Sequence, residues 1–149
     1  MSVASSFVTL LSACDTFTDL LPDDAEAGDY IFNTESNDVD PPLALYRVTP
    51  NSNLVGTGDG SAYLTNGTVT LRLCVPSEED ETMTEGGLRV ADIAQDLQLE
   101  LITLSASGAY MLLRGVTFTE PQRTDETLVD GNGDTYWSVD FNIEWGLTE

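Results

Sequence analysis

The sequence predicts an α+β domain, in which an antiparallel four-stranded sheet carries its helices packed on one face. A segment with apolar residues at helical spacing separates two pairs of predicted strands, and in two of these strands apolar and polar residues alternate. Another helical pattern begins the chain, so the expected order of elements is α-β-β-α-β-β. With 149 residues the chain has the length of one domain, which we expect to span residues 1–149.

The first predicted elements are a helix over residues 3–21 and a strand over residues 43–50. We expect the helix to break near Asp15 and to end at Pro22, because proline cannot continue a helix. The sequence between these elements, residues 22–42, is rich in Asp, Asn, Glu and Pro. It is predicted to be a long surface segment.

The next predicted strand covers residues 68–75, where four apolar side chains alternate with polar ones. It follows residues 51–67, a Gly- and Asn-rich stretch that we expect to be a second long surface segment. Asn66 and Gly67 are a strong two-residue hairpin signal. They predict that residues 61–65 pair with the strand that follows.

The second half of the chain predicts a helix over residues 88–104 and two strands. An acidic run just before this helix is typical of a solvated helix entrance, where negative charge interacts favourably with the helix dipole. Residues 109–120 form a strongly apolar strand, and residues 121–134 form a polar connection. Residues 136–145 alternate apolar and polar side chains without exception, which predicts a strand that pairs with residues 109–120.

The connection before the last strand raises the question of a metal site, because Asp130, Asn132 and Asp134 alternate with glycines. A calcium loop of the helix-loop-helix type needs Gly at its sixth position and Glu at its twelfth. Those positions hold Thr135 and Phe141 here. Gly, Asn and Asp are also the residues of tight turns, so a hairpin loop is the favoured interpretation and a bound cation the alternative.

Charge is the unusual property of this composition. The chain has 26 acidic residues against 5 basic ones, all Arg, which gives a formal net charge of -21. A basic surface for wrapping duplex DNA is therefore excluded. Its aromatic residues argue against a disordered acidic chain. The Asp-rich, Lys-free composition resembles that of haloarchaeal proteins and their viruses, which work in brine that screens self-repulsion; a generic acidic surface is the alternative.

We expect no enzymatic activity and no cofactor. Without His, the Ser/His/Asp and Cys/His arrangements cannot form, and the sequence contains neither a phosphate loop followed by Lys nor a Cys-x-x-Cys motif. Cys14 and Cys74 are expected to be free thiols. Residues 11–14 resemble a lipoprotein signal box, but the first basic residue is Arg47, so we favour a helix there. No apolar run approaches the roughly 20 residues of a membrane span.

The order of elements resembles that of the tail-terminator proteins of long-tailed phages of the lambda type and of related haloarchaeal tailed viruses. The segments that carry this resemblance cover most of the chain. They are SVASSFVTLLSAC, LALYRVTP to TVTLRLCVP, VADIAQDLQLELITL, AYMLLRGVTFTEPQ and DTYWSVDFNIEWG. The chain departs from simpler members of that family in its acidic segment at 22–42 and in its lack of Lys.

The resemblance implies a structural protein of the virion, assembled in the host cytoplasm and not bound to membrane. Such a protein forms a homo-hexameric ring that caps the tail-tube protein below and meets the head connector or stopper protein above. DNA passes through the lumen without specific binding, which an acidic lining would favour.

Within such a ring, we expect Arg47, Arg72 and Arg114 to pair with carboxylates of neighbouring subunits, pairing within one chain being the alternative. We expect the contact on the tail side to come from the connection over 51–67. Its residues for this contact are Asn53, Leu54, Val55 and Tyr63.

Two alternative functions remain open from the sequence. One is another structural protein of the neck, tail or baseplate, which would share the same physical properties. The other is a secreted or lipid-anchored acidic domain that holds calcium through Asp130, Asn132 and Asp134.

Overall fold

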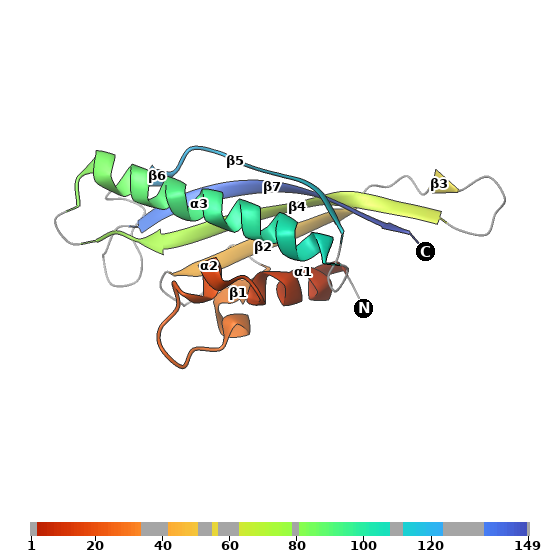
Figure 1. Ribbon diagram of the computed structural model, residues 1–149, viewed down its shortest axis with the longest axis horizontal. Coiled ribbons are helices and arrows are strands. Elements are labelled where there is room, and N and C mark those ends of the chain that lie inside the picture. The colour runs from red at the N-terminus through yellow and green to blue at the C-terminus, as the bar shows by residue number, and fades with distance from the viewer. Residues whose placement is uncertain are drawn as a thin grey trace.

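The computed structural model describes residues 3–33, 42–50, 55–56, 63–78, 81–107, 112–123 and 136–148. Its elements in chain order are α1 (Val3–Ser12), α2 (Asp15–Thr18), the 3-10 helix η1 (Ala27–Tyr30), β1 (Ile31–Phe32), β2 (Leu43–Pro50), β3 (Val55–Gly56), β4 (Tyr63–Pro76), α3 (Met83–Ala106), β5 (Leu113–Phe118), β6 (Gln122–Arg123) and β7 (Tyr136–Thr148). Figure 1 shows α3 running along the long strands β4 and β7. The α+β class is confirmed.

The sheet is mixed, so the prediction of a purely antiparallel four-stranded sheet is wrong. Its main strands follow the order β1-β2-β4-β7-β5, with β3 paired to β4 and β6 paired to β7. Strand β1 runs parallel to β2, while the other pairs are antiparallel. The extra strands β1, β3 and β6 have two residues each, which is too short for an alternating pattern.

The predicted hairpin at Asn66 and Gly67 is also wrong. Both residues lie inside β4, which continues through them and pairs with β7 from Leu64 to Pro76. A two-residue turn signal reports only a local preference, and here a long ladder with a distant strand outweighs it. Gly67 lies opposite Trp145 in that ladder.

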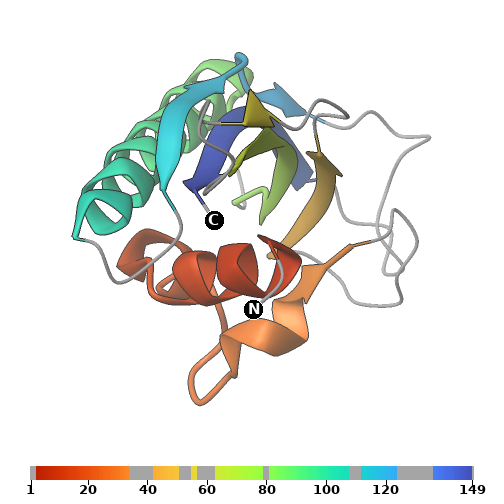
Figure 2. The same cartoon turned by 90° about the vertical axis from the view of Figure 1, so that its right-hand side faces the viewer.

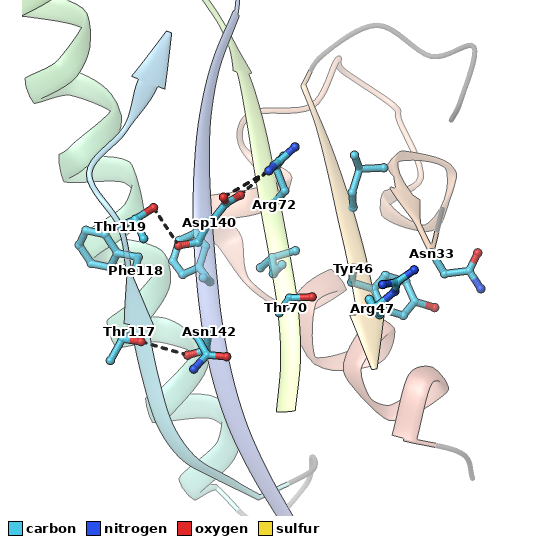
Figure 3. Close-up of a pocket in the computed structure, with 13 residues that line it drawn as sticks. Asn33, Tyr46, Arg47, Thr70, Arg72, Thr117, Phe118, Thr119, Asp140 and Asn142 are labelled. Carbon is cyan, nitrogen blue, oxygen red and sulfur yellow. Dashed lines mark hydrogen bonds and ion pairs between the residues drawn. The ribbon is translucent and has the colours of Figure 1, made fainter. Parts of the chain in front are cut away.

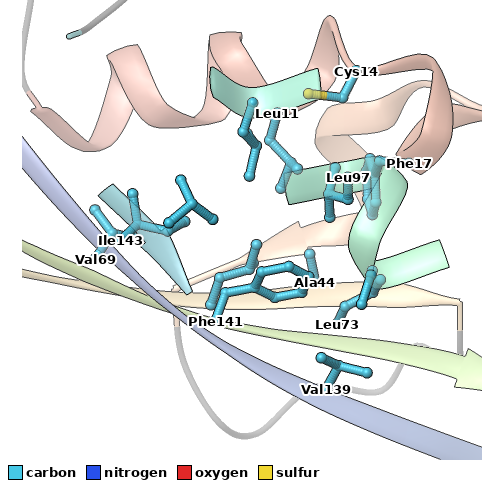
Figure 4. Packing of buried hydrophobic residues seen from close by; sticks show 14 of the residues in the cluster. Leu11, Cys14, Phe17, Ala44, Val69, Leu73, Leu97, Val139, Phe141 and Ile143 are labelled. Atoms are coloured by element: carbon cyan, nitrogen blue, oxygen red, sulfur yellow. The ribbon is translucent and has the colours of Figure 1, made fainter. Parts of the chain in front are cut away.

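One face of the sheet and the helices enclose the core. From Val69 to Val75 of β4 and from Trp137 to Trp145 of β7, the side chains that alternate toward this face are buried, as the sequence predicts for the last strand. Figure 4 shows them packed against α1, α2 and α3. This core includes Phe7, Leu10, Leu11, Phe17, Val69, Leu71, Leu73, Val90, Ala94, Leu97, Leu101, Val139, Phe141 and Ile143. Burial of such side chains contributes about 2 kcal/mol each.

The N-terminal helices are joined to α3 by a carboxylate. The predicted break near Asp15 is confirmed, because α1 ends at Ser12 and α2 begins at Asp15. Glu100 of α3 accepts hydrogen bonds from the backbone N–H groups of Asp15 and Thr16 and, at 2.6 Å, from the Thr16 hydroxyl. These are the free donors of a helix start, so Glu100 caps α2 from another element. Figure 2 shows α1 in red beside α3 in green.

The acidic segment after α2 is more than a surface connection. It contains η1 and β1, and Ile31 is buried in the core against β2. The segment 22–42 therefore contributes an edge strand to the sheet, in addition to exposed acidic residues. Residues 34–41 lie outside the described residues.

Helix α3 begins earlier than the periodicity predicted. Thr82 is its N-cap, and the Thr82 side chain accepts a hydrogen bond from the N–H of Glu85 at 3.1 Å. The helix also covers the outer edge of β5 through two polar side chains. Ser105 Oγ accepts from the N–H of Leu113, and Gln98 Nε2 donates to the carbonyl of Val116, both at 2.7 Å. An exposed strand edge is prone to pairing with other chains, and these contacts occupy part of it.

Candidate functional site

The face of the sheet opposite α1 and α3 has a different composition from the core face. We call this surface the open face. Paired residues of neighbouring strands point to the same face, so the register places its side chains in rows. One row joins Leu45, Arg72 and Asp140 across three strands. The next row joins Arg47, Thr70, Asn142 and Thr117.

An ion pair lies near the middle of the open face. Arg72 Nε donates to Asp140 Oδ1 at 2.8 Å, and Arg72 Nη2 donates to Oδ2 at 3.3 Å, so the pair has the two-pronged geometry of a guanidinium and a carboxylate. The bond to Asp140 raises the pKa of Arg72. Both side chains are about half exposed, at 55% and 53%. Exposed ion pairs contribute between about 0 and 1 kcal/mol to stability. The Arg72–Asp140 pair therefore matters more as a feature of this surface than as a source of stability.

The open face is hollowed around this ion pair. The hollow has a volume of about 490 Å³ and extends over strands β2, β4, β7 and β5 (Figure 3). Leu45, which is half-buried, supplies apolar surface to it, whereas Phe118 borders it but packs against Phe141 of the core. Arg47 and Arg72 place two guanidinium groups along the same hollow, and Asn142 lies between them and β5. The hollow therefore combines apolar surface with donors for carboxylates.

The three Arg residues singled out from the sequence lie on this one face. Arg72 pairs within its own chain, whereas no carboxylate of the described residues pairs with Arg47 or Arg114. Arg114 lies against Gly146, since a Cβ on that glycine would be 2.5 Å from Arg114 Nε. Gly146 follows the buried Trp145, so its Cα–H points to the open face. The expected pairing between subunits stays a prediction.

Of the other predicted site residues, the structure describes the backbone of Val55 and Tyr63. Val55 and Tyr63 lie in β3 and β4, at a strand pair beyond the end of β2. Asn53 and Leu54 lie outside the described residues. The candidate cation ligands Asp130, Asn132 and Asp134 also lie outside them.

Among the described residues, the acidic side chains are concentrated away from the open face. On α3, the exposed side chains include Glu85, Asp92 and Asp96. The segment from α2 to η1 adds Asp15, Asp19, Asp23, Asp24, Glu26 and Asp29. On the open face, the strand residues Asp140 and Glu144 stand beside three Arg side chains. Counted over the described residues, this face of a chain with a net charge of -21 is therefore locally balanced or slightly positive.

The two thiols have no reactive setting. Cys14 and Cys74 are free and buried, and burial raises the pKa of each to about 12. A thiol attacks as its thiolate, which at that pKa is scarce at neutral pH. Among the described residues, no group of three or more His, Cys, Asp or Glu side chains could hold a metal ion. None of the helices in the described ranges combines the length and apolarity of a membrane span.

The sequence interpretation missed a second surface, the outward side of α3. Leu88 and Leu99 are 65% and 67% exposed there, although they belong to a helix that buries its opposite side. The signal was present, because these residues fall on the side of the helical repeat opposite to the core residues Val90, Leu97 and Leu101. Comparison with protein-family models and with curated proteins finds no match for the chain.

Proposed function

We propose that this chain is a structural protein of a tailed virus, and that its copies form a hexameric ring at the junction of head and tail. The ring ends the tail tube and joins it to the connector above. The observation that carries this proposal is the separation of charge between two faces of one subunit. Arg47, Arg72 and Arg114 gather on the open face, while most acidic residues of the described ranges gather on and beside the helices.

Two unlike faces on one subunit favour assembly in a closed ring. A contact between different surfaces repeats from subunit to subunit, and it closes when the rotation between neighbours divides a full turn. A surface with a net charge of -21 would repel identical copies at most orientations. Electrostatic complementarity selects the orientation in which the open face meets an acidic face.

The acidic excess also suits a lumen that DNA must cross. Carboxylates repel the phosphate backbone, so a lining of Asp and Glu offers DNA no sites at which to stick. The resemblance in element order to tail terminators supports the position at the end of the tail tube. Stopper, tube and baseplate proteins would use the same physical properties, so their positions are the nearest competing assignments.

The alternative of a lipid-anchored domain finds less support in the fold. Cys14 is fully buried, and its Sγ donates to the carbonyl of Leu10 at 3.4 Å. An acyl chain on this sulfur has no room in such a core.

The function is tested in virus particles. We expect particles that lack this chain to contain heads without joined tails, and free tails whose tubes are not ended at a uniform length. In complete particles, electron microscopy should place the subunit between the tube and the head connector. Finding it at the distal tip of the tail, or joined tails of normal length in its absence, would contradict the proposal.

A further inference from the structure

The outward side of α3 is an exposed surface that combines apolar and acidic residues. Leu88, Leu99 and Ile102 are 65%, 67% and 37% exposed. Asp92 and Gln95 lie between them on the same side of the helix, and Asp96 lies at its margin. We call these six residues the α3 stripe. It extends over about 20 Å, at 1.5 Å per residue.

This composition is unusual for the solvent side of a helix. A helix packed on one side of a sheet normally presents polar residues outward. The core side of α3 is complete without the stripe, since Val90, Leu97 and Leu101 are fully buried beneath it. Apolar residues grouped on an exposed face often mark an interaction surface.

The acidic residues of the α3 stripe limit what can cover it. Asp92 and Asp96 are exposed, and no Arg of the described residues pairs with either of them. A partner must therefore bring cationic groups next to apolar surface. A neutral or acidic apolar surface would leave these carboxylates unpaired and desolvated, which is costly.

The hollow of the open face offers that combination. Arg47 lines it without a carboxylate partner among the described residues, and Arg72 lines it with its guanidinium half exposed. Leu45 provides apolar surface in the same hollow. The hollow lies on the face of the sheet opposite α3, and the α3 stripe lies on the side of α3 that points away from the sheet, so one chain cannot join them within itself.

We propose that the α3 stripe of one subunit docks into the hollow on the open face of a second copy of this chain. In this contact, Asp92 and Asp96 meet Arg47 and Arg72 of the neighbour, and the Leu side chains of the stripe lie on its apolar surface. The contact joins two different surfaces, so it leads from subunit to subunit around a ring. This inference rests on the proposed ring and specifies its interface.

Two charge-reversed chains test the contact. The first carries Arg47→Glu, which makes its hollow acidic while its stripe stays acidic. The second carries Asp92→Arg and Asp96→Arg, which makes its stripe cationic while its hollow stays cationic. When either chain assembles alone, like charges then face each other at the proposed contact and repel. We expect each to need at least about a hundredfold higher concentration to assemble at about 0.15 M salt, where screening reaches about 8 Å.

An equimolar mixture of the two chains should restore assembly, because the acidic stripe fits the cationic hollow and the cationic stripe fits the acidic hollow. Rings of alternating chains would form, with a mass close to that of the wild-type ring by light scattering. A control with Glu26→Arg and Asp29→Arg changes the net charge as much as the second chain does, on a segment outside both surfaces. It should assemble like the wild type.

The outcomes separate this inference from the proposed function. If the wild type forms rings and each reversed chain forms them equally well alone, the docking contact is wrong and the ring stands. The same holds if the mixture fails to restore assembly although both chains have the wild-type circular dichroism spectrum. Wild-type chains that stay single at every salt concentration, with or without tail tubes, would overturn both.

Discussion

Two neighbouring glycines at the start of α3 differ in the space around them. A Cβ on Gly86 would lie 2.4 Å from Trp137 Cζ2, which is closer than atoms can approach. A Cβ on Gly87 would meet nothing nearer than 3.9 Å, an ordinary van der Waals contact. Trp137 is 3% exposed, so its ring has little room to move away. Gly86 is therefore required by packing, whereas Gly87 is not.

Alanine at these two positions should change stability in opposite directions. Ala is favoured over Gly inside a helix by about 1 kcal/mol, and we expect Gly87→Ala to gain most of this amount. Gly86→Ala should lower the free energy of unfolding by about 1–3 kcal/mol, because Trp137 must shift within a packed core. Urea unfolding followed by tryptophan fluorescence measures both. An equal gain for the two variants would show that the Trp137 contact does not restrict Gly86.

Glu81, just before α3, connects the start of this helix to strand β7. Its carboxylate accepts from Arg89 Nε at 2.6 Å and from Trp137 Nε1 at 3.3 Å. Arg89 Nη2 also donates to the carbonyl of Pro76, at the end of β4. The Arg89 guanidinium is the main cause that lowers the pKa of Glu81 from 4.5 to about 2.

The lowered pKa of Glu81 predicts a pH-dependent contribution to folding. A carboxylate with a depressed pKa in the folded state stabilises above its unfolded pKa, near 4.5, and this contribution is lost as the pH falls toward 2. Glu81→Gln should therefore be less stable than the wild type by about 1 kcal/mol at pH 7 and nearly equal to it near pH 2.

A matched control for this measurement is Glu78→Gln. Glu78 Oε1 lies 3.7 Å from Arg89 Nε, and the Glu78 side chain is 66% exposed. Glu78→Gln should therefore lower the free energy of unfolding by less than about 0.5 kcal/mol. Urea midpoints at several pH values give both differences. If the stability difference between the wild type and Glu81→Gln stays constant from pH 7 to pH 2, the negative charge of Glu81 does not stabilise the fold.

At the scale of elements, the contact between α3 and β5 covers part of the edge of the sheet. Ser105 is 5% exposed, and its Oγ accepts from the N–H of Leu113. Ser105→Ala leaves that buried donor without a partner, which should cost about 1–3 kcal/mol and speed amide exchange at Leu113. Thr103→Ala is the control, because Thr103 is exposed and bonds only along its own helix to Leu99. If the two variants behave alike, Ser105 does not close the edge.

The long elements were predictable because each repeats its pattern several times. The strand at 43–50 matches β2, the helix at 88–104 lies within α3, and the pairing of β5 with β7 is confirmed. The two-residue strands carry no such pattern. At Asn66 and Gly67 the local signal pointed to a turn, but the partner of β4 is β7, which lies far along the chain.

The candidate site was predictable only in part. Because the chain has only five cationic residues, Arg47, Arg72 and Arg114 could be selected from the sequence as candidates. The alternation of apolar and polar residues also placed Arg72 on the side of its strand opposite to the buried residues. Its neighbour Asp140 is 68 residues away, so their meeting depends on a register that periodicity does not contain. The outward residues of α3 were visible at helical spacing, but the core side of the same helix accounts for its amphipathic pattern without them.

At the scale of the whole molecule, charge sets the conditions under which the fold is stable. A net charge of -21 repels itself most strongly in low salt. We expect the unfolding temperature to rise by on the order of 10 °C between about 0.1 M and 2 M KCl, which corresponds to roughly 3 kcal/mol for a domain of this size. Circular dichroism measures it, with an equal osmolality of sucrose as the control. No change with KCl would remove the argument for adaptation to brine.

The central claim is that the chain works by fitting against copies of itself, and its native mass tests this most directly. Size-exclusion chromatography with light scattering in about 2 M KCl should give about 97 kDa, six times the 16.1 kDa of one chain, or a single chain that forms rings only when tail tubes are added. A mass of 16.1 kDa that persists with tail tubes present would contradict the account.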